Sequence, residues 1–263
     1  MPQPAISRRT PSPGARLEPV FRSSTVDMIA DRIREAILSG ALPPGSALGE
    51  ADMAAQLGVS RGPLREGMQR LVQEGLLTTV RRRGLGVVTM TDEDIADVYL
   101  MRAAVERAAA RQLLRMDPRH IKQTVKLLTA ELRRMGRAAT KGAARQLGDC
   151  DLTFHRTLVD AAASPRLSRS IRTLLVETRL CTLSIHDSFE VRADLADSHE
   201  QLVAALSERD EPRLCALLET HMAEAAARLT ANAKRADDYV TFAAPTPAEP
   251  LSLDPIDLPE TPL

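Results

Sequence analysis

The sequence predicts a mostly α-helical protein, in which an N-terminal winged helix-turn-helix precedes an all-α antiparallel helical bundle. Aromatic residues make up only 2% of the 263 residues and Trp is absent. The core must therefore consist of Leu, Ala, Val, Ile and Met, a composition that suits helix packing. Residues 48–89 read as two short helices followed by a hairpin, whereas residues 92–235 contain only helical periods.

Composition limits the class of protein. The 35 Lys and Arg balance 35 Asp and Glu, so affinity for nucleic acid requires a local basic surface. Three cysteines without CxxC spacing indicate reduced thiols, and no apolar stretch follows the twin arginine at 8–9, which argues against a signal peptide. Because no run reaches the roughly 18 apolar residues of a membrane span, we expect a cytoplasmic protein without membrane contact.

We predict four segments along the chain. Residues 1–19, rich in Pro, Ser and Arg, and the Pro-rich acidic tail 236–263 are expected to be disordered. Residues 20–90 form the predicted winged helix-turn-helix domain, and residues 91–235 form the predicted all-α domain. The expected helices are 24–39, 50–57, 61–73, 92–114, 118–136, 143–162, 165–187, 192–207 and 211–235, with strands at 76–80 and 86–89 and a loop at 136–142.

Local signals support each boundary. In the first helix, apolar residues recur on one face, and Gly40 can end it. Gly58 terminates the second helix, Ser60 caps the third, and Gly75 stops it. Thr91, followed by three acidic residues, opens the long helical region. Proline stands near the start of three later helices, where its missing N–H is harmless: Pro118, Pro165 and Pro212.

The third helix and the hairpin after it carry the candidate nucleic-acid contacts. Arg61 lies in the first turn and Arg65 follows at i+4 on the same face, from which arginine forks reach guanine edges in a major groove. A basic run precedes Gly84, whose missing Cβ allows close backbone approach. The candidate DNA-binding residues are Ser60, Arg61, Arg65, Arg70, Arg81, Arg82, Arg83 and Gly84. Alternatively, the helix arginines form a solvated face, and Arg70 serves a domain interface.

A second constellation lies in the helical region. Asp151 and His155 share one helix face at i and i+4. His199 and His221 stand eleven residues before and after Asp210, the centre of the turn between the last two helices, so an antiparallel hairpin puts both imidazoles at one level. One Asp and three His suit zinc above all, with nickel, iron or manganese as alternatives. Alternatively, Asp151 and His155 form an ordinary ion pair. We interpret His120 and His186 as structural.

The run LGEADMAAQLGVSRGPLREGMQRLVQEGLLTTVRRRGLGVV resembles the N-terminal domain of the GntR family of bacterial transcriptional regulators. The resemblance covers residues 23–90. It implies DNA contacts at Ser60, Arg61, Arg65 and Gly84. One departure is Ala51, which stands after Glu50 where a basic residue is common in the family.

Residues 92–233 resemble the FCD-type ligand-binding domain of the FadR subfamily. The motifs that carry the resemblance are Tyr99-Leu100-Met101-Arg102 with Glu106, DLTFH at 151–155, His199 and His221. The resemblance implies that Asp151, His155, His199 and His221 hold a divalent cation and that an organic acid completes the coordination. It also implies that Arg102 binds the carboxylate of the effector, although an ion pair between Arg102 and Glu106 is an equal alternative. Ser164 stands where the family often has Asn.

We therefore expect a transcriptional regulator, most often a repressor in this family, that binds a palindromic operator as a homodimer. A small organic acid bound at the metal-containing pocket would change its DNA affinity. One rival is a metal-free regulator that responds to acyl-CoA or fatty acids. Another rival is a metalloenzyme fused to a DNA-binding head, but four predicted protein ligands and the lack of an HExxH motif argue against an enzyme.

Overall fold

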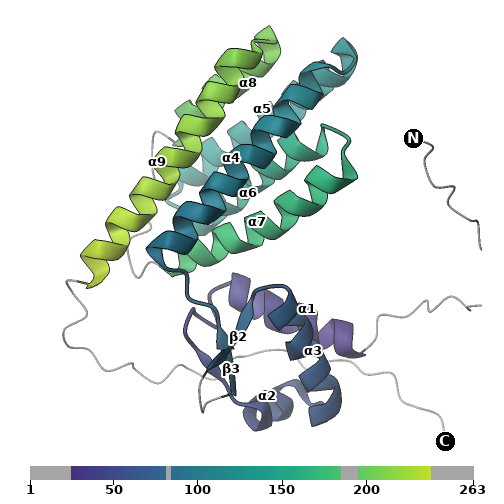
Figure 1. Ribbon diagram of the computed structural model, residues 1–263, viewed down its shortest axis with the longest axis vertical. Coiled ribbons are helices and arrows are strands. Elements are labelled where there is room, and N and C mark those ends of the chain that lie inside the picture. Colours follow the sequence, from purple (N-terminus) through teal and green to yellow (C-terminus); the bar gives the residue numbers. More distant parts are fainter. Residues whose placement is uncertain (1–24, 81–83, 185–194, 238–263) are drawn as a thin grey trace, which may run out of the picture.

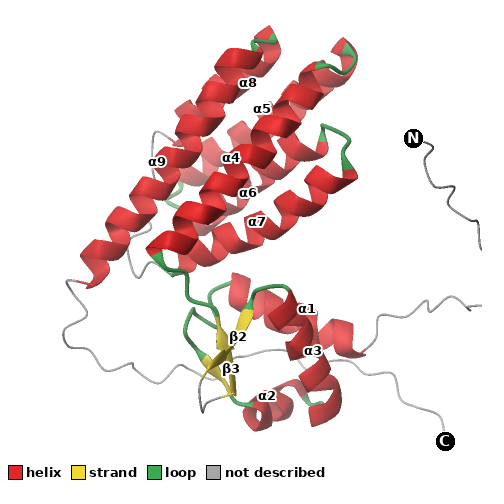
Figure 2. Ribbon diagram, viewed as in Figure 1, coloured by secondary structure: helices red, strands yellow, loops and turns green. Residues whose placement is uncertain are grey.

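The computed structural model describes residues 25–80, 84–184 and 195–237. Its helices and strands form two groups that are consecutive in the sequence (Figures 1 and 2). The N-terminal elements are α1 (Thr25–Leu38), β1 (Ala47–Leu48), α2 (Glu50–Leu57), α3 (Arg61–Gln73), β2 (Leu77–Val80) and β3 (Gly84–Val87). The C-terminal elements are α4 (Asp92–Leu114), α5 (Pro118–Thr140), α6 (Ala144–Asp160), α7 (Pro165–Leu183), α8 (Leu195–Glu208) and α9 (Glu211–Asp237). The predicted fold class is confirmed.

The N-terminal elements form a compact head. Its core contains fully buried aliphatic residues of α1 and α3, including Ile29, Ile33 and Leu64. The two helices cross closely at Gly67, since a Cβ there would lie 2.9 Å from Cγ2 of Ile29. An antiparallel sheet in the order β1-β3-β2 covers one side of the head.

The six remaining helices form the bundle. α4 packs along α9 and α7, while α5 packs against α6 and α8. Thr91 begins α4 with a capping box, in which its side chain and that of Asp94 each bind the other residue's backbone N–H. Four of these helices, α4, α6, α8 and α9, surround a cluster of buried polar residues in an otherwise aliphatic interior. The cluster contains Arg102, Glu106, His155, His199 and His221.

α7 connects the bundle to the head. Leu180 of α7 is fully buried in the core cluster of the head. Next to it, the Nε of Arg179 donates a hydrogen bond of 3.1 Å to the carbonyl oxygen of Leu38, the last residue of α1. The head and the bundle therefore share both an apolar contact and a polar contact at this point.

Several predicted boundaries are wrong. α5 continues through Gly136 to Thr140, because Met135 and Ala138 are buried and their packing outweighs the helix cost of about 1 kcal/mol for one glycine. Gly142, with φ +64°, ends this segment instead. The strand predicted at 86–89 spans Gly84–Val87, and β1 was not predicted, since two residues carry no readable alternation.

The remaining boundaries lie within a few residues of the prediction. α7 ends at Leu183, four residues earlier than expected, and α9 extends two residues further, to Asp237. The predicted disordered segment 1–19 and almost all of the predicted tail 236–263 lie outside the described residues, as does the predicted start of the helix at 192. Within the described part of the chain, no helix combines the length and the apolar character needed to cross a membrane.

Candidate metal centre and nucleic-acid interface

The structure brings the four predicted metal ligands together between three helices. Asp151 and His155 lie on α6, His199 on α8 and His221 on α9. Each residue offers one ligand atom, and these atoms all lie within 4.8 Å of one another. Nε2 of His199 lies 3.1 Å from Oδ1 of Asp151 and 3.3 Å from Nε2 of His155. The three histidines are buried, whereas the Asp151 side chain keeps 20% exposure.

This donor set fits a divalent cation. Two nitrogens at zinc-bond distances of about 2.0–2.1 Å and a tetrahedral angle lie about 3.4 Å apart, close to the separation of 3.3 Å between the Nε2 atoms of His155 and His199. Three imidazoles and one carboxylate suit zinc and the other late first-row metals. Packing of Phe154 against the rings of His155 and His199, at centroid distances of 5.5 and 4.7 Å, supplies an apolar wall on one side.

Glu106 of α4 orients His155. Nδ1 of His155 lies 2.5 Å from Oε2 of the fully buried Glu106, and a carboxylate accepts, so Nδ1 carries the proton. Nε2 is then left with a lone pair directed at Asp151 and His199. A carboxylate behind a histidine ligand is the usual arrangement in metal sites, where it raises the basicity of the imidazole.

Arg102 forms the ion pair with Glu106 that the i,i+4 spacing allowed. Its Nε donates to Oε1 of Glu106 over 3.1 Å, and its Nη1 reaches Oγ1 of Thr178 on α7 at 3.5 Å. Nη2 lies 3.0 Å from the same carboxylate oxygen, but within the described residues it makes no hydrogen bond, although the side chain is buried. The guanidinium also lies 5.3 Å from the ring centroid of Tyr99. Beside this ion pair, Nη2 of Arg102 is therefore a buried donor that can still form a hydrogen bond.

The electrostatics of the cluster match the protonation states that a cation requires. Burial lowers the pKa of His155 and lowers that of His221 well below its ordinary value, so both imidazoles stay neutral. Burial acts to raise the pKa of Asp151, but the hydrogen bond with His199, together with smaller contributions from the imidazoles of His155 and His199 and from Arg102, holds this pKa well below the usual range. Neutral histidines and an ionised carboxylate are the forms that bind metal.

The predicted DNA-contacting residues of α3 lie at the surface of the head. Ser60 occupies the N-cap position of α3, but its side chain makes no capping hydrogen bond, which corrects the predicted role as a cap. Arg61 is exposed in the first turn. Arg65 is also exposed, and its Nε forms an ion pair of 2.7 Å with Glu50 of α2. The exposed face of α3 with Arg61 and Arg65, the predicted DNA-reading face, therefore carries one arginine with a carboxylate partner and one that has none among the described residues.

The other residues predicted for DNA binding differ in their placement. Arg70 forms an ion pair with Asp27 near the start of α1, so it holds two helices of the head together in this structure. Gly84 adopts φ +85° at the start of β3, and no atom of the described residues lies within 4 Å of the place where a Cβ would lie. The predicted wing arginines Arg81, Arg82 and Arg83 lie outside the described residues, as does His186.

Two further sequence interpretations can be compared with the structure. Nε2 of His120 lies 2.7 Å from the carbonyl oxygen of Ala161, so this histidine has the structural role predicted for it. Ser164, considered as a replacement for a polar pocket residue, caps α7 by accepting a hydrogen bond from the N–H of Leu167. The hydroxyl of Ser164 therefore caps the N-terminus of α7.

The sequence reasoning missed Glu106 and Thr178 as members of the cluster. Glu106 was noted as part of a family motif and as a partner for Arg102, but not as a partner for His155, because that contact spans 49 residues. The sequence does contain a sign of this role, because Glu106 lies on the apolar side of a long helix with Val105, Ala109 and Ala110. A carboxylate at such a buried position needs a partner.

Comparisons with known proteins agree with the two-part architecture. The model described as "Bacterial regulatory proteins, gntR family" matches residues 25–87, and the model described as "FCD domain" matches residues 97–238. The matches cover the head and the bundle separately.

Known relatives are similar over most of this chain. A probable D-xylose utilization operon transcriptional repressor from Paenarthrobacter nicotinovorans is 30% identical over 200 residues, which cover 76% of this chain and 86% of the relative. The gluconate operon transcriptional repressor of Bacillus subtilis (strain 168) is 26% identical, with 72% and 78% covered. A crystal structure of a transcriptional regulator GntR from Rhodococcus sp. RHA1 superposes with a TM-score of 0.69 at 26% identity, covering 80% of this chain and 99% of the other.

Proposed function

Since this chain belongs to the gntR family of bacterial regulatory proteins and carries the FCD domain usual in the FadR subfamily, we propose that a divalent metal ion and a small organic acid in its bundle control its affinity for DNA. The regulator is proposed to act as a repressor, in line with relatives that are described as operon repressors. The observation that carries the proposal is the convergence of Asp151 with the buried histidines His155, His199 and His221.

The ligand residues and their support have separate roles. Asp151 and the three histidines would hold the cation, while Glu106 orients His155 through its Nδ1–H. The bound cation would supply positive charge that attracts a carboxylate. Nη2 of Arg102, buried without a hydrogen bond among the described residues, offers a donor in the same polar cluster for that carboxylate. Sugar acids, hydroxy acids and amino-acid catabolites all fit this description.

The proposed output is a change in how two heads bind DNA. Two-fold symmetry would let a homodimer present two copies of α3 to the half-sites of a palindromic operator. Arg61 and Arg65 would read base edges, Ser60 and the amides at the start of α3 would bind phosphate, and Gly84 would allow close approach of the wing. An effector that favours one arrangement of the bundles would change operator affinity by its coupling energy, typically about 1–3 kcal/mol.

Metal analysis of the purified protein tests the first part of the proposal. We expect about one equivalent of zinc or another late first-row metal per chain when chelators are omitted, and its loss in the variant His221→Ala. His120→Ala is the matched control, because His120 bonds the backbone of Ala161 away from the cluster. A full-length, folded protein without stoichiometric metal would instead favour the metal-free regulator.

Effector coupling tests the second part. Operator duplexes can be selected from random-sequence DNA, and organic acids screened by thermal shift with and without metal, because a ligand of the native state raises its apparent stability. An acid that stabilises only the metal-loaded protein should change operator affinity by about 5- to 150-fold. An equal response in the metal-free protein would contradict the coordination model.

A further inference from the structure

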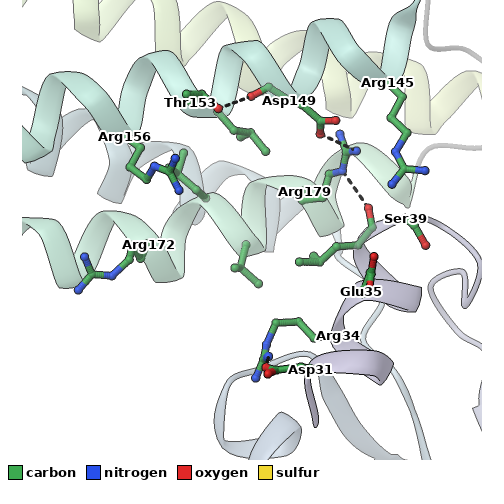
Figure 3. A pocket seen from close by; sticks show the side chains of 14 residues that line it. Asp31, Arg34, Glu35, Ser39, Arg145, Asp149, Thr153, Arg156, Arg172 and Arg179 are labelled. Carbon is green, nitrogen blue, oxygen red and sulfur yellow. Dashed lines mark hydrogen bonds and ion pairs between the residues drawn. The ribbon is translucent and has the colours of Figure 1, made fainter. Parts of the chain in front are cut away.

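A groove separate from the metal cluster lies at the junction between the head and the bundle (Figure 3). It has a volume of about 550 Å³, within the range of small-molecule sites. α1 of the head forms one wall, and the consecutive helices α6 and α7 of the bundle form the other. None of the four predicted metal ligands lines it.

The bundle wall is strongly basic. Five arginines and three acidic residues line the groove, and four of the arginines belong to α6 and α7. Two of the acids already have arginine partners: Asp31 pairs with Arg34, and Asp149 with Arg179. Among the described residues, Arg145, Arg156 and Arg172 have no ion-pair partner, and the third acid, Glu35, lies on the opposite wall. The bundle wall therefore carries excess positive charge.

The arginines lie in two groups at the two ends of the groove. Figure 3 shows Arg145 with Arg179 at one end and Arg156 with Arg172 at the other. Seven residues separate the two arginines on α7, which corresponds to about 10 Å along a helix, and eleven residues on α6 correspond to about 16 Å. Apolar residues also line the groove: Leu152, which lies between the two arginines of α6 in the sequence, and Leu175 and Val176, which lie between those of α7.

Arg179 connects this basic wall to the head. Its Nη2 lies 3.0 Å from Oδ1 of Asp149, and its Nε donates to the carbonyl oxygen of Leu38 at the end of α1. The side chain is only 10% exposed, and burial lowers its pKa; Asp149 opposes this shift, and the neighbouring charge of Arg145 adds to it. An additional anion at this end would relieve the repulsion between the two arginines.

We propose that this groove is a second ligand site, for a small molecule with two anionic groups about 10 Å apart and an apolar segment between them. Guanidinium forks suit carboxylate and phosphate groups equally, so dicarboxylates and bisphosphates share the required chemistry. The ligand would bind the two arginine groups, cover the apolar residues of the groove and contact α1, so it would bridge the head and the bundle. This site is independent of the metal centre.

Calorimetric titration of the full-length, chelator-treated protein with straight-chain α,ω-dicarboxylates of four to ten carbons tests the proposal, because removal of the metal removes the carboxylate site proposed at the cation. We expect the longer diacids to bind and the mono-acid hexanoate to bind at least tenfold more weakly. 1,6-Hexanediol bisphosphate, titrated in parallel, shows whether phosphate or carboxylate is preferred. Absence of binding by every dianion, or equal binding of hexanoate, would overturn the proposal.

Two double variants locate the binding. R156Q/R172Q removes the charge at one end, and we expect affinity for the dianion to fall at least tenfold. R166Q/R169Q removes two exposed arginines of α7 that do not line the groove, and it should leave the affinity unchanged. Binding should also survive His221→Ala, which separates this site from the metal centre. Retention of full affinity in R156Q/R172Q, or its loss in His221→Ala, would contradict the proposed site.

Discussion

The candidate metal cluster of the bundle and the predicted DNA-reading face of α3 in the head use charged residues in opposite ways. In the bundle, Glu106 and Arg102 are buried, and each side chain is held by partners from other helices. In the head, Arg61 and Arg65 are exposed, and of the two only Arg65 has an ion-pair partner among the residues that the structure describes. Buried charges are costly without partners, so their geometry is set in advance, whereas exposed arginines keep the freedom to meet a phosphate or a base.

The comparison teaches which substitutions affect folding and which affect binding alone. Changes in the buried network should lower stability and metal affinity together. Changes on the reading face should alter DNA binding and leave the free energy of unfolding almost unchanged, because exposed ion pairs contribute about 0–1 kcal/mol.

The largest expected effect is that of Glu106→Ala. This substitution leaves the buried guanidinium of Arg102 without its carboxylate and removes the acceptor for Nδ1 of His155. We expect the free energy of unfolding of the metal-free protein to fall by about 3–5 kcal/mol, measured by urea denaturation. Glu93→Ala, at an exposed position near the start of α4, is the control. If the free energy of unfolding falls by less than about 1 kcal/mol, the buried charges of the bundle do not contribute more to stability than the exposed charges of the head, and the proposed difference is wrong.

His221→Ala should weaken metal binding next most strongly. It removes one of four ligands, so we expect more than the roughly 10- to 100-fold loss that follows removal of an outer-shell partner. Competition with a metal-sensitive chelator dye measures this affinity. A loss smaller than that of Glu106→Gln would mean that His221 is no ligand.

Arg65→Ala should reduce affinity for a selected operator by about 1–3 kcal/mol, the range for one bidentate arginine–guanine contact. The free energy of unfolding should stay within 1 kcal/mol of the original value, because the pair with Glu50 is exposed. Fluorescence anisotropy at fixed salt measures DNA binding, and Arg111→Ala on the bundle surface is the control. Unchanged discrimination between operator and scrambled DNA would contradict a base-reading role.

The pH dependence sharpens the contrast further. Burial lowers the pKa of His155 and His221 in the folded state, whereas in the unfolded chain these histidines protonate near pH 6.5. Below about pH 6.5 the unfolded state therefore binds more protons, and the metal-free protein should lose up to about 1.4 kcal/mol per pH unit for each such histidine. Urea denaturation at pH 7.5 and 5.5 measures the loss. His221→Gln should reduce the slope, and an unchanged slope would contradict the assignment.

The smallest effect is expected for Glu50→Gln. Its carboxylate pairs with Arg65 on the surface, so the free energy of unfolding should change by about 0–1 kcal/mol. Because the ion pair would compete with a contact between this guanidinium and DNA, we expect operator affinity to rise slightly or stay constant. A marked fall in affinity, measured in the same anisotropy assay, would show that Glu50 orients Arg65 for reading.

Local patterns in the sequence determined most of the helices. They also placed Asp151 and His155 on one helix face, and His199 and His221 at the same height along a helical hairpin. Helical periodicity, a capping box at Thr91 and a glycine after α2 act over one or two turns, so they can be read without the fold. The equal spacing of His199 and His221 about their turn needed only the geometry of a helical hairpin. Their ring centroids lie 4.7 Å apart in the structure.

Only the tertiary structure decided the contacts that join distant elements. The hydrogen bond between Glu106 and His155, the pairing of Arg70 with Asp27, the short strand β1 and the insertion of Leu180 into the core of the head all depend on which helix faces pack together. Each of these contacts spans tens of residues and follows from mutual burial of apolar surface. A single sequence carries no periodic signal for such pairings, because the hydrophobic effect that drives them has no direction along the chain.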